Sequence, residues 1–355
     1  MSQQSQSDNV KPLLTASVHD VRYFTALLRG IAFSNRASVT LRADGGITVT
    51  VEEARTLLAT SYIYPDHFDE WSYNVDDIQA APSQLSAPDV DRESITLEIP
   101  LNTLIECLNI FGTANISSSS TGSKHKKWRR ADGGSDDERG DEGQPPNVNR
   151  LDQYFGSNEK RTSMRLSYAG PGHPLTLLLA EDSTGPTTTC EISTFDPEPN
   201  IELPFDADQT VLKIIFKSSF WLRDALSELD PSCDKITFIC NPVEDVQRAQ
   251  IGIPAKPLFR IQATGAFGST EMDYPNDREV LETFECSRSV HVSYRFAHIS
   301  RTLRALQNST KTSLRIEEEG LLSLQFLVPV PKPRGGMSDS FIEFRCLALD
   351  DAVAQ

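Results

Sequence analysis

Apolar residues recur at steps of three or four in four short segments of the chain, the spacing of one buried helix face. In the first segment, within 18–33, the apolar positions are Val21, Phe24, Leu28 and Ile31. The other three segments are marked by Leu101, Leu104, Leu108 and Phe111, by Leu222, Leu226 and Leu229, and by Ile299, Leu303 and Leu306. We therefore expect four amphipathic helices, two in each half of the chain.

Each predicted helix is followed by segments in which apolar and polar residues alternate, as they do in strands with one buried face. Strands are expected at 39–41 and 47–51, joined by a turn at 43–46, and again at 57–63. Later strands are expected at 164–168, 175–180, 188–193, 236–240, 259–264, 314–316, 322–326 and 341–347. This repeated order predicts an α+β fold of two similar domains, each with two helices packed on antiparallel β-sheet.

Two stretches interrupt the repeat. Residues 115–150 are rich in Ser, Gly and charged residues, a composition that cannot bury a core, and we expect a disordered insert at about 114–160. Residues 195–210 place Pro197, Pro199 and Pro204 among acids, which favours an extended interdomain connector. The two predicted domains therefore run 13–194 and 211–350, after a disordered tail at 1–12.

Charge and cysteine usage narrow the classes of function. The net charge of −16 argues against a surface coated with basic residues, although it leaves room for one small cationic face. The six cysteines stand singly, without the spacing of a metal site, so we expect reduced thiols, no metal and no cofactor. No apolar run is long enough to cross a bilayer, so no membrane partner is expected.

Three stretches resemble a known family. They are 46–55 (GITVTVEEAR), 95–112 (ITLEIPLNTLIECLNIFG) and 313–326 (SLRIEEEGLLSLQF), the last followed by 341–344. With the repeat order, the sequence resembles the Rad-one-type subunits of the nine-one-one DNA-damage checkpoint clamp, a PCNA-like family, over roughly 13–113 and 160–350. The resemblance implies a DNA-clamp (PCNA-like) fold and a heterotrimeric ring, formed with two sister clamp subunits around double-stranded DNA. It also implies a clamp loader, checkpoint and repair client proteins, a nuclear location and no catalytic residues.

In such rings the helices line the hole, where cations can hold phosphates without reading sequence. The candidate DNA-facing residues, on or near the predicted helices, are Arg22, Arg29, Lys213, Lys217, Arg223, Arg301, Arg304 and Lys311. The second helix departs from this pattern, because its polar face carries Asn102, Glu106 and Asn109 and no cation. For each Arg or Lys, the alternative role is an ordinary solvated surface position.

Clamp subunits join by continuing a β-sheet from one chain to the next. By position in the repeat, the candidate interface residues are Leu175, Leu177, Leu179, Phe259, Ile261 and Ala263, with core packing as the alternative. Candidates for a client-peptide pocket under the connector are Leu203, Pro204 and Phe205, which could instead only anchor it. A possible nuclear-import signal in the insert consists of Lys124, Lys126, Lys127, Arg129 and Arg130, with an uninformative charged loop as the alternative.

Two other functions remain open. A metal-dependent 3′-to-5′ DNA exonuclease would need converging carboxylates. The candidate groups are Asp206 with Asp208, the acids at 136–138, and those at 317–319; all of them suit solvated acids better. A protein-interaction scaffold without DNA contact predicts no alignment of cations along helices. The pairs Arg22 with Arg29 and Arg301 with Arg304 argue against it. Trp71 and Trp221 are expected to be core or connector anchors rather than base-stacking platforms.

Overall fold

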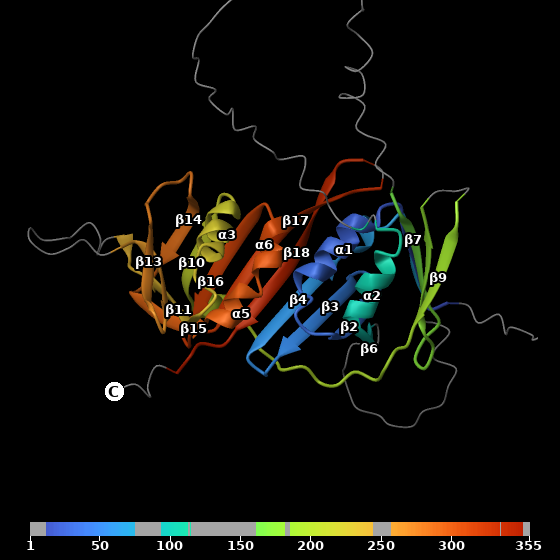
Figure 1. The fold of residues 1–355 in the computed structure, drawn as a ribbon, viewed down its shortest axis with the longest axis horizontal. Helices are drawn as coiled ribbons and strands as arrows, with labels where there is room; N and C mark the ends of the chain where they lie inside the picture. The colour runs from blue at the N-terminus through green and yellow to red at the C-terminus, as the bar shows by residue number, and fades with distance from the viewer. Residues whose placement is uncertain are drawn as a thin grey trace, which may run out of the picture.

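The computed structural model describes residues 12–74, 94–112, 114, 161–181, 185–243, 257–333 and 335–350. Within these residues the chain forms three antiparallel sheets and a row of short helices (Figure 1). The predicted tail and nearly all of the predicted insert lie outside the described residues, as does the possible nuclear-import signal at 124–130.

The largest sheet has nine strands and is built from both halves of the chain. In spatial order they are β14 (Leu281–Cys286), β10 (Thr210–Phe216), β16 (Lys311–Glu317), β17 (Leu322–Pro331), β18 (Met337–Cys346), β4 (Leu57–Ile63), β3 (Gly46–Glu53), β2 (Arg36–Arg42) and β6 (Ser94–Pro100). The halves meet where β18 pairs with β4, from Phe341 opposite Tyr62 to Cys346 opposite Leu57. One continuous sheet therefore joins the two domains.

A smaller sheet lies at each end of the long axis (Figure 1). One has the order β5 (Glu70–Tyr73), β1 (Leu14–Val18), β7 (Ser163–Tyr168), β8 (Leu175–Ala180) and β9 (Thr187–Ile192). The other has the order β13 (Gly268–Tyr274), β12 (Phe259–Gly265), β11 (Cys233–Cys240) and β15 (Val290–Arg295). Strands β9 and β13 are edge strands, and Figure 1 places them at opposite ends of the molecule.

The helices form one row across the nine-stranded sheet (Figure 1). Helix α6 (Leu303–Asn308) packs against both α3 (Phe220–Ser227) and α1 (Val21–Gly30), and α2 (Leu101–Leu108) packs against α1. The fourth predicted helix is broken into α5 (Phe296–Ser300) and α6. At the break, the Thr302 hydroxyl donates to the Ile299 carbonyl at 2.7 Å. Two short 3-10 helices, η1 (Pro65–His67) and η4 (Ala207–Gln209), complete the helical segments among the described residues.

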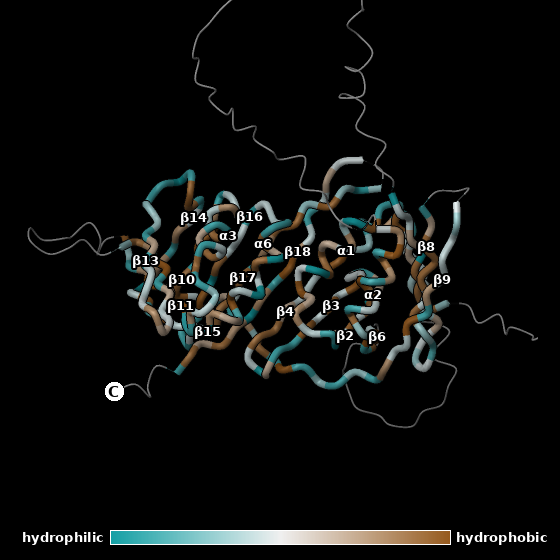
Figure 2. The backbone as a smooth tube through the Cα atoms, in the orientation of Figure 1, coloured by the Kyte–Doolittle hydropathy of each residue, from teal (hydrophilic) through white to brown (hydrophobic). Residues whose placement is uncertain are grey.

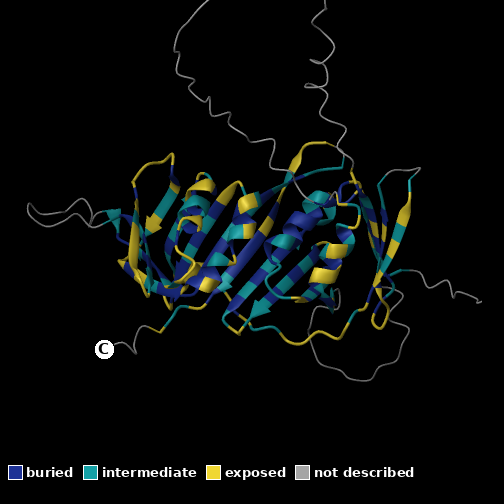
Figure 3. Ribbon diagram, in the orientation of Figure 1, coloured by how far each residue is buried: buried dark blue, intermediate teal, exposed yellow. Residues whose placement is uncertain are grey.

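The core lies between the helix row and the sheets. All four apolar positions predicted for the first helix, Val21, Phe24, Leu28 and Ile31, are buried. Hydrophobic and hydrophilic residues alternate along many strands (Figure 2), and the central strands are largely buried while β9 and β13 carry exposed stretches (Figure 3). The β2–β3 turn needs glycine at Gly46, whose φ is +72° and where a Cβ would lie 2.2 Å from the Ile63 carbonyl oxygen.

Candidate DNA-facing and subunit-contact surfaces

Two arginines meet in a groove on the helix row, at the junction of the two domains. The groove is lined by Ala26, Arg29, Ala32, Asn102, Ile105, Ala114, Arg304, Gln307 and Asn308. Arg29 Nη1 donates to the Ala114 carbonyl at 3.2 Å, and Arg304 Nη1 donates to the Ala32 carbonyl at 3.4 Å. Burial lowers the pKa of Arg29, and the charge of Arg304 lowers it further. Two guanidinium groups are thus held close enough to repel each other, an arrangement that suits an anion between them.

Two further candidates lie on the helix layer but have acidic partners. Arg301, at the break between α5 and α6, pairs with Glu53 at 3.1 Å. Arg223 on α3 pairs with Asp224 at 3.0 Å and lies over the Phe220 ring, 5.1 Å from its centroid. Their side chains are 43% and 35% exposed, so phosphates could still reach both. Their positive charge is, however, partly neutralised within the chain.

Arg22 does not belong to this cationic surface. Its side chain is only 12% exposed and binds the Asp20 carboxylate through Nη2 at 2.7 Å and Nε at 3.0 Å. Asp20 is the N-cap of α1 and accepts the Arg22 backbone N–H as well. Burial would raise the pKa of Asp20, but these hydrogen bonds outweigh it and hold the pKa below its usual value. This engagement in the helix cap argues against the prediction that Arg22 faces DNA.

Lys213 and Lys311 lie on the face of the sheet opposite the helices. In β10 the residues Leu212, Ile214 and Phe216 are buried, and Lys213 alternates with them. Lys213 stands opposite Arg315 in β16, the strand on which Lys311 occupies the same face as Arg315. This placement argues against their expected DNA contact. The three predicted lysines of this region bind acids: Lys213 with Glu285 at 3.4 Å, Lys217 with Glu279 at 2.6 Å, and Lys311 with Glu282 at 2.7 Å.

The strands predicted as subunit edges are internal. Strand β8 pairs with both β7 and β9, and β12 pairs with both β11 and β13. The six predicted interface residues are all buried core positions: Leu175, Leu177, Leu179, Phe259, Ile261 and Ala263. Their placement at a free edge is wrong, and core packing was the correct alternative. The edges of the two end sheets are β5 and β9 in one and β13 and β15 in the other. The residues of β9 and β13 are mostly exposed or half-buried and carry little of the apolar alternation used to find strands.

The connector is fixed to the sheet face opposite the helices. Leu203 is buried and its carbonyl accepts from Arg345 Nη1 at 2.8 Å, while the Phe205 ring lies over the Arg315 guanidinium at 4.8 Å. Pro204, between them, is exposed. Two of the three predicted client-pocket residues therefore anchor the connector, and contact with a client is a separate question.

A buried carboxylate lies beneath this anchor. Glu343 is 5% exposed and accepts hydrogen bonds from Arg345 at 2.9 Å, Ser323 at 2.8 Å and Gln325 at 3.2 Å. Burial would raise the pKa of Glu343, but the bonds from Arg345, Ser323 and Gln325 hold it below its usual value. The floor under the connector is thus a charged network rather than an open apolar pocket.

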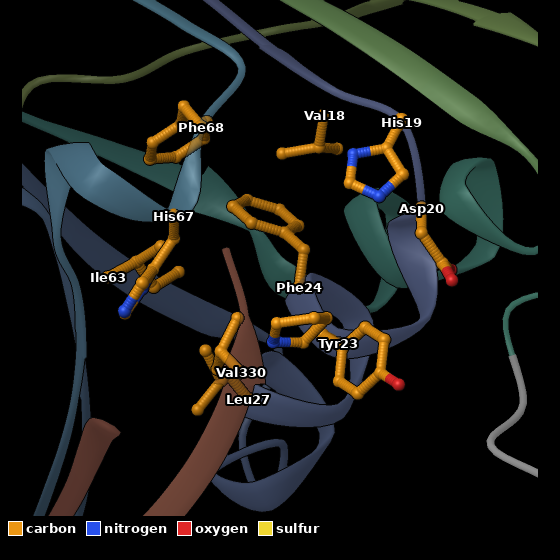
Figure 4. Close-up of a pocket in the computed structure, with 11 residues that line it drawn as sticks. Val18, His19, Asp20, Tyr23, Phe24, Leu27, Ile63, His67, Phe68 and Val330 are labelled. Atoms are coloured by element: carbon orange, nitrogen blue, oxygen red, sulfur yellow. The ribbon is translucent and has the colours of Figure 1, made fainter. Parts of the chain in front are cut away.

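A small cleft separates the β17–β18 hairpin from α1 (Figure 4). Val330 and Pro331 of the hairpin face Phe24, and the Phe24 and Phe68 rings meet edge to face with centroids 6.2 Å apart. Lys332 at the hairpin tip pairs with Asp66 at 2.8 Å. The hairpin therefore fastens the C-terminal domain onto the N-terminal one.

The candidate nuclease carboxylates are engaged in local structure where they are described. Asp206 caps η4, and the Glu317 carboxylate accepts the Asp206 backbone N–H. Across the described ranges, no three His, Cys, Asp or Glu side chains gather as they would to hold a metal ion. The acids at 136–138 lie outside those ranges. Nor does any described helix have the length and hydrophobicity to span a bilayer. Trp221, predicted as an anchor, is 40% exposed.

The chain is similar to known proteins in both sequence and fold. A family model described as repair protein Rad1/Rec1/Rad17 matches residues 13–328. The chain is 28% identical to the mouse cell cycle checkpoint protein RAD1, covering 92% of this chain and 91% of that one. It is 27% identical to the Mycosarcoma maydis protein named DNA repair exonuclease REC1, covering 96% of each. Among solved structures, proliferating cellular nuclear antigen from Entamoeba histolytica matches 96% of this chain and 100% of its own, with a TM-score of 0.59 and 15% identity. The fold is therefore the PCNA-like clamp fold that the sequence predicted.

Proposed function

This chain belongs to the Rad1 family of repair proteins, and we propose that it is a non-catalytic subunit of a heterotrimeric checkpoint clamp that encircles double-stranded DNA. The observation that carries the proposal is the single row of helices across one continuous sheet, with Arg29 and Arg304 adjacent at its centre. A ring must hold a duplex without reading its sequence, and cations aimed at phosphates meet that need.

Arg29 and Arg304 are the principal DNA contacts in this proposal. The charge of Arg304 lowers the pKa of Arg29, and a backbone phosphate between them would relieve the repulsion. Arg301 and Arg223 flank this position and serve as weaker contacts, because each is partly neutralised by a carboxylate. Helix α2 contributes no cation, so this part of the lining is nearly indifferent to DNA.

The remaining parts of the proposal concern assembly and recruitment. Sister subunits join at the β9 and β13 edges by continuing the end sheets. A clamp loader places the ring on DNA in the nucleus, and checkpoint and repair proteins are then recruited. Pro204, exposed between the two connector anchors, is the point at which a client peptide would meet the connector. These parts rest on the family and on the clamp fold.

The test compares two double variants in rings assembled with the sister subunits on linear DNA, where a ring can slide off an end and phosphate contacts slow its escape. Arg29→Gln with Arg304→Gln removes two charges from the helix face, and Lys213→Gln with Lys311→Gln removes two from the opposite face. The helix-face variant should be retained less well, and its retention should depend less steeply on salt, because two phosphate contacts are lost. The matched variant should behave as wild type. Equal retention of the two variants would remove Arg29 and Arg304 from the DNA contact.

The second candidate function is a metal-dependent exonuclease, because the Mycosarcoma maydis relative is named DNA repair exonuclease REC1. The pure chain, incubated with Mg²⁺ and 3′-labelled DNA, distinguishes the two functions. The clamp proposal expects no release of label above that of a chelator control. Release that persists through purification, and is abolished by substituting one group of acids, would favour the nuclease.

A further inference from the structure

Each end of the molecule presents an open strand edge (Figure 1). In β9 only Ile192 is buried, and in β13 only Tyr274 is buried. An edge strand offers unpaired N–H and C=O groups to any chain that can align with it. Backbone pairing alone does not choose a partner, so the side chains around each edge must decide which chain is accepted.

Helix α2 and the two outermost strands at the β9 edge carry acids and no cation at their described positions. The charged residues of α2, β8, β9 and the adjoining Glu181 are three carboxylates, those of Glu106, Glu181 and Glu191, with no Lys or Arg among these described positions. Glu106 lies on the helix layer and Glu191 on the sheet layer, and both are exposed. The negative charge thus spans both layers of this end.

The β13 end is also acidic. Residues 220–228 and 259–279 contain six carboxylates and three arginines. Arg260 is already bound by Asp273 at 2.5 Å and by Glu271, and Arg223 is bound by Asp224. These pairs neutralise acids as well as arginines, but six carboxylates against three arginines leave a net negative charge in these ranges, and Glu228 on the helix layer is exposed.

Joining one copy to another would bring these like charges together. In both edge strands the buried residue marks the inner face, so Glu191 of one copy would share the outer face with Glu271 and Asp273 of the next. Arg260 offsets one of those two charges, so the cluster that meets Glu191 is still negative. On the helix layer, Glu106 would approach Glu228. Like charges on neighbouring strands destabilise their pairing. The net charge of −16 adds repulsion at longer range.

We propose that this chain does not join copies of itself, and that each end accepts a sister subunit whose edge strand and adjoining helix carry lysine or arginine. The proposal rests on the ring assembly proposed above and deepens it, because it names the chemistry of the partner surface. Attraction between unlike charges would both speed the encounter of sister subunits and reject a second copy of this chain.

Charge reversal at one end tests the proposal on the full chain. Glu106→Lys with Glu191→Lys makes the β9 end cationic while the β13 end stays acidic. Sedimentation at low salt should show head-to-tail self-association at least tenfold tighter than that of wild type, equivalent to about 1.4 kcal/mol. The gain should vanish near 0.5 M salt, where screening acts over about 4 Å. Wild type should remain monomeric in both buffers.

The matched control is Glu318→Lys with Glu319→Lys, an equal change of charge in the exposed turn between β16 and β17. A β9-end variant that associates no more than this control, or wild type that forms trimers regardless of salt, would overturn the proposal. If the lysine variant does not fold, Glu106→Gln with Glu191→Gln carries the same test, and should self-associate more tightly than wild type by a smaller factor. Failure of wild type to assemble with its sister subunits would refute the proposed ring. The self-association result does not depend on that outcome, so the two proposals can fail separately.

Discussion

Removing the Glu343 side chain should destabilise the protein and release the connector. Glu343 is 5% exposed and lies between two guanidinium groups, Arg345 Nη2 at 2.9 Å and Arg315 Nη2 at 3.8 Å. The side chains of both arginines are also largely buried, at 28% and 21% exposure. In Glu343→Ala, two half-buried cations lose the carboxylate that compensates them, while Ser323 and Gln325 lose an acceptor.

The magnitude follows from the burial of the network. Breaking a buried ion pair by removing one partner typically destabilises a protein by about 3–5 kcal/mol, because an uncompensated charge remains inside. The matched control is Glu285→Ala, whose carboxylate is 63% exposed and contacts Lys213 at 3.4 Å. An exposed pair of this kind contributes about 0–1 kcal/mol.

Urea unfolding measures the free energy, and limited proteolysis at 195–210 reports on the connector. Glu343→Ala should lower the unfolding midpoint clearly and speed cleavage of the connector, because Arg345 also holds the Leu203 carbonyl. Glu285→Ala should change neither. If the two variants lose the same small free energy, or if cleavage is unchanged, the charged network does not hold the connector.

Other consequences of the structure can be measured on the isolated chain. Ala54 and Arg55 adopt φ of +53° and +57°, so Ala54→Asn with Arg55→Gly should stabilise the chain by about 1–2 kcal/mol, seen as a higher melting temperature; a lower one would contradict the strain. Leu177→Ala in the buried strand β8 should destabilise by about 2–5 kcal/mol, whereas Thr189→Ala on the edge strand β9 should change stability little; equal losses would contradict the strand order. Asp20→Asn keeps a helix cap but loses the ion pair with Arg22. Because the pKa of Asp20 is lowered in the folded state, the variant's loss of unfolding free energy relative to wild type should be full at neutral pH and shrink as pH falls below 3.8. A loss that does not depend on pH would show that the Asp20 charge does not stabilise the fold.

Strong periodicity made most of the fold predictable from sequence. The four helices and the strands between 39 and 63 follow regular apolar spacing, and the structure has them. Strands β1, β5, β13, β14 and β15 were missed because they are short or mainly polar. Strand β13, for example, has one buried residue in seven, so no alternation marks it. The break between α5 and α6 was missed because the apolar spacing of Ile299, Leu303 and Leu306 runs through it, whereas the bond from the Thr302 hydroxyl to the Ile299 carbonyl marks it only in the structure.

The functional surfaces were less predictable, for physical reasons that particular residues illustrate. Leu177 was placed at a subunit edge by the position of its strand in the repeat, yet this apolar strand is the internal strand β8, and the more polar β9 is the edge. Lys213 was placed near DNA because it precedes a helix, but strand alternation turns it to the opposite face. The seven-residue spacing of Arg22 and Arg29 predicted that both lie on one helix face. Only the structure shows that Asp20 binds Arg22.

The central claim is that the assembled ring is linked to DNA by topology rather than by tight contact. The direct measurement is retention of the wild-type assembly, with its sister subunits, on closed circular DNA before and after the circle is cut once. We predict that the assembly survives a high-salt wash on the circle and is lost from the linear form, because a ring can slide off an open end. Loss from both forms, or equal retention on both, would contradict encirclement.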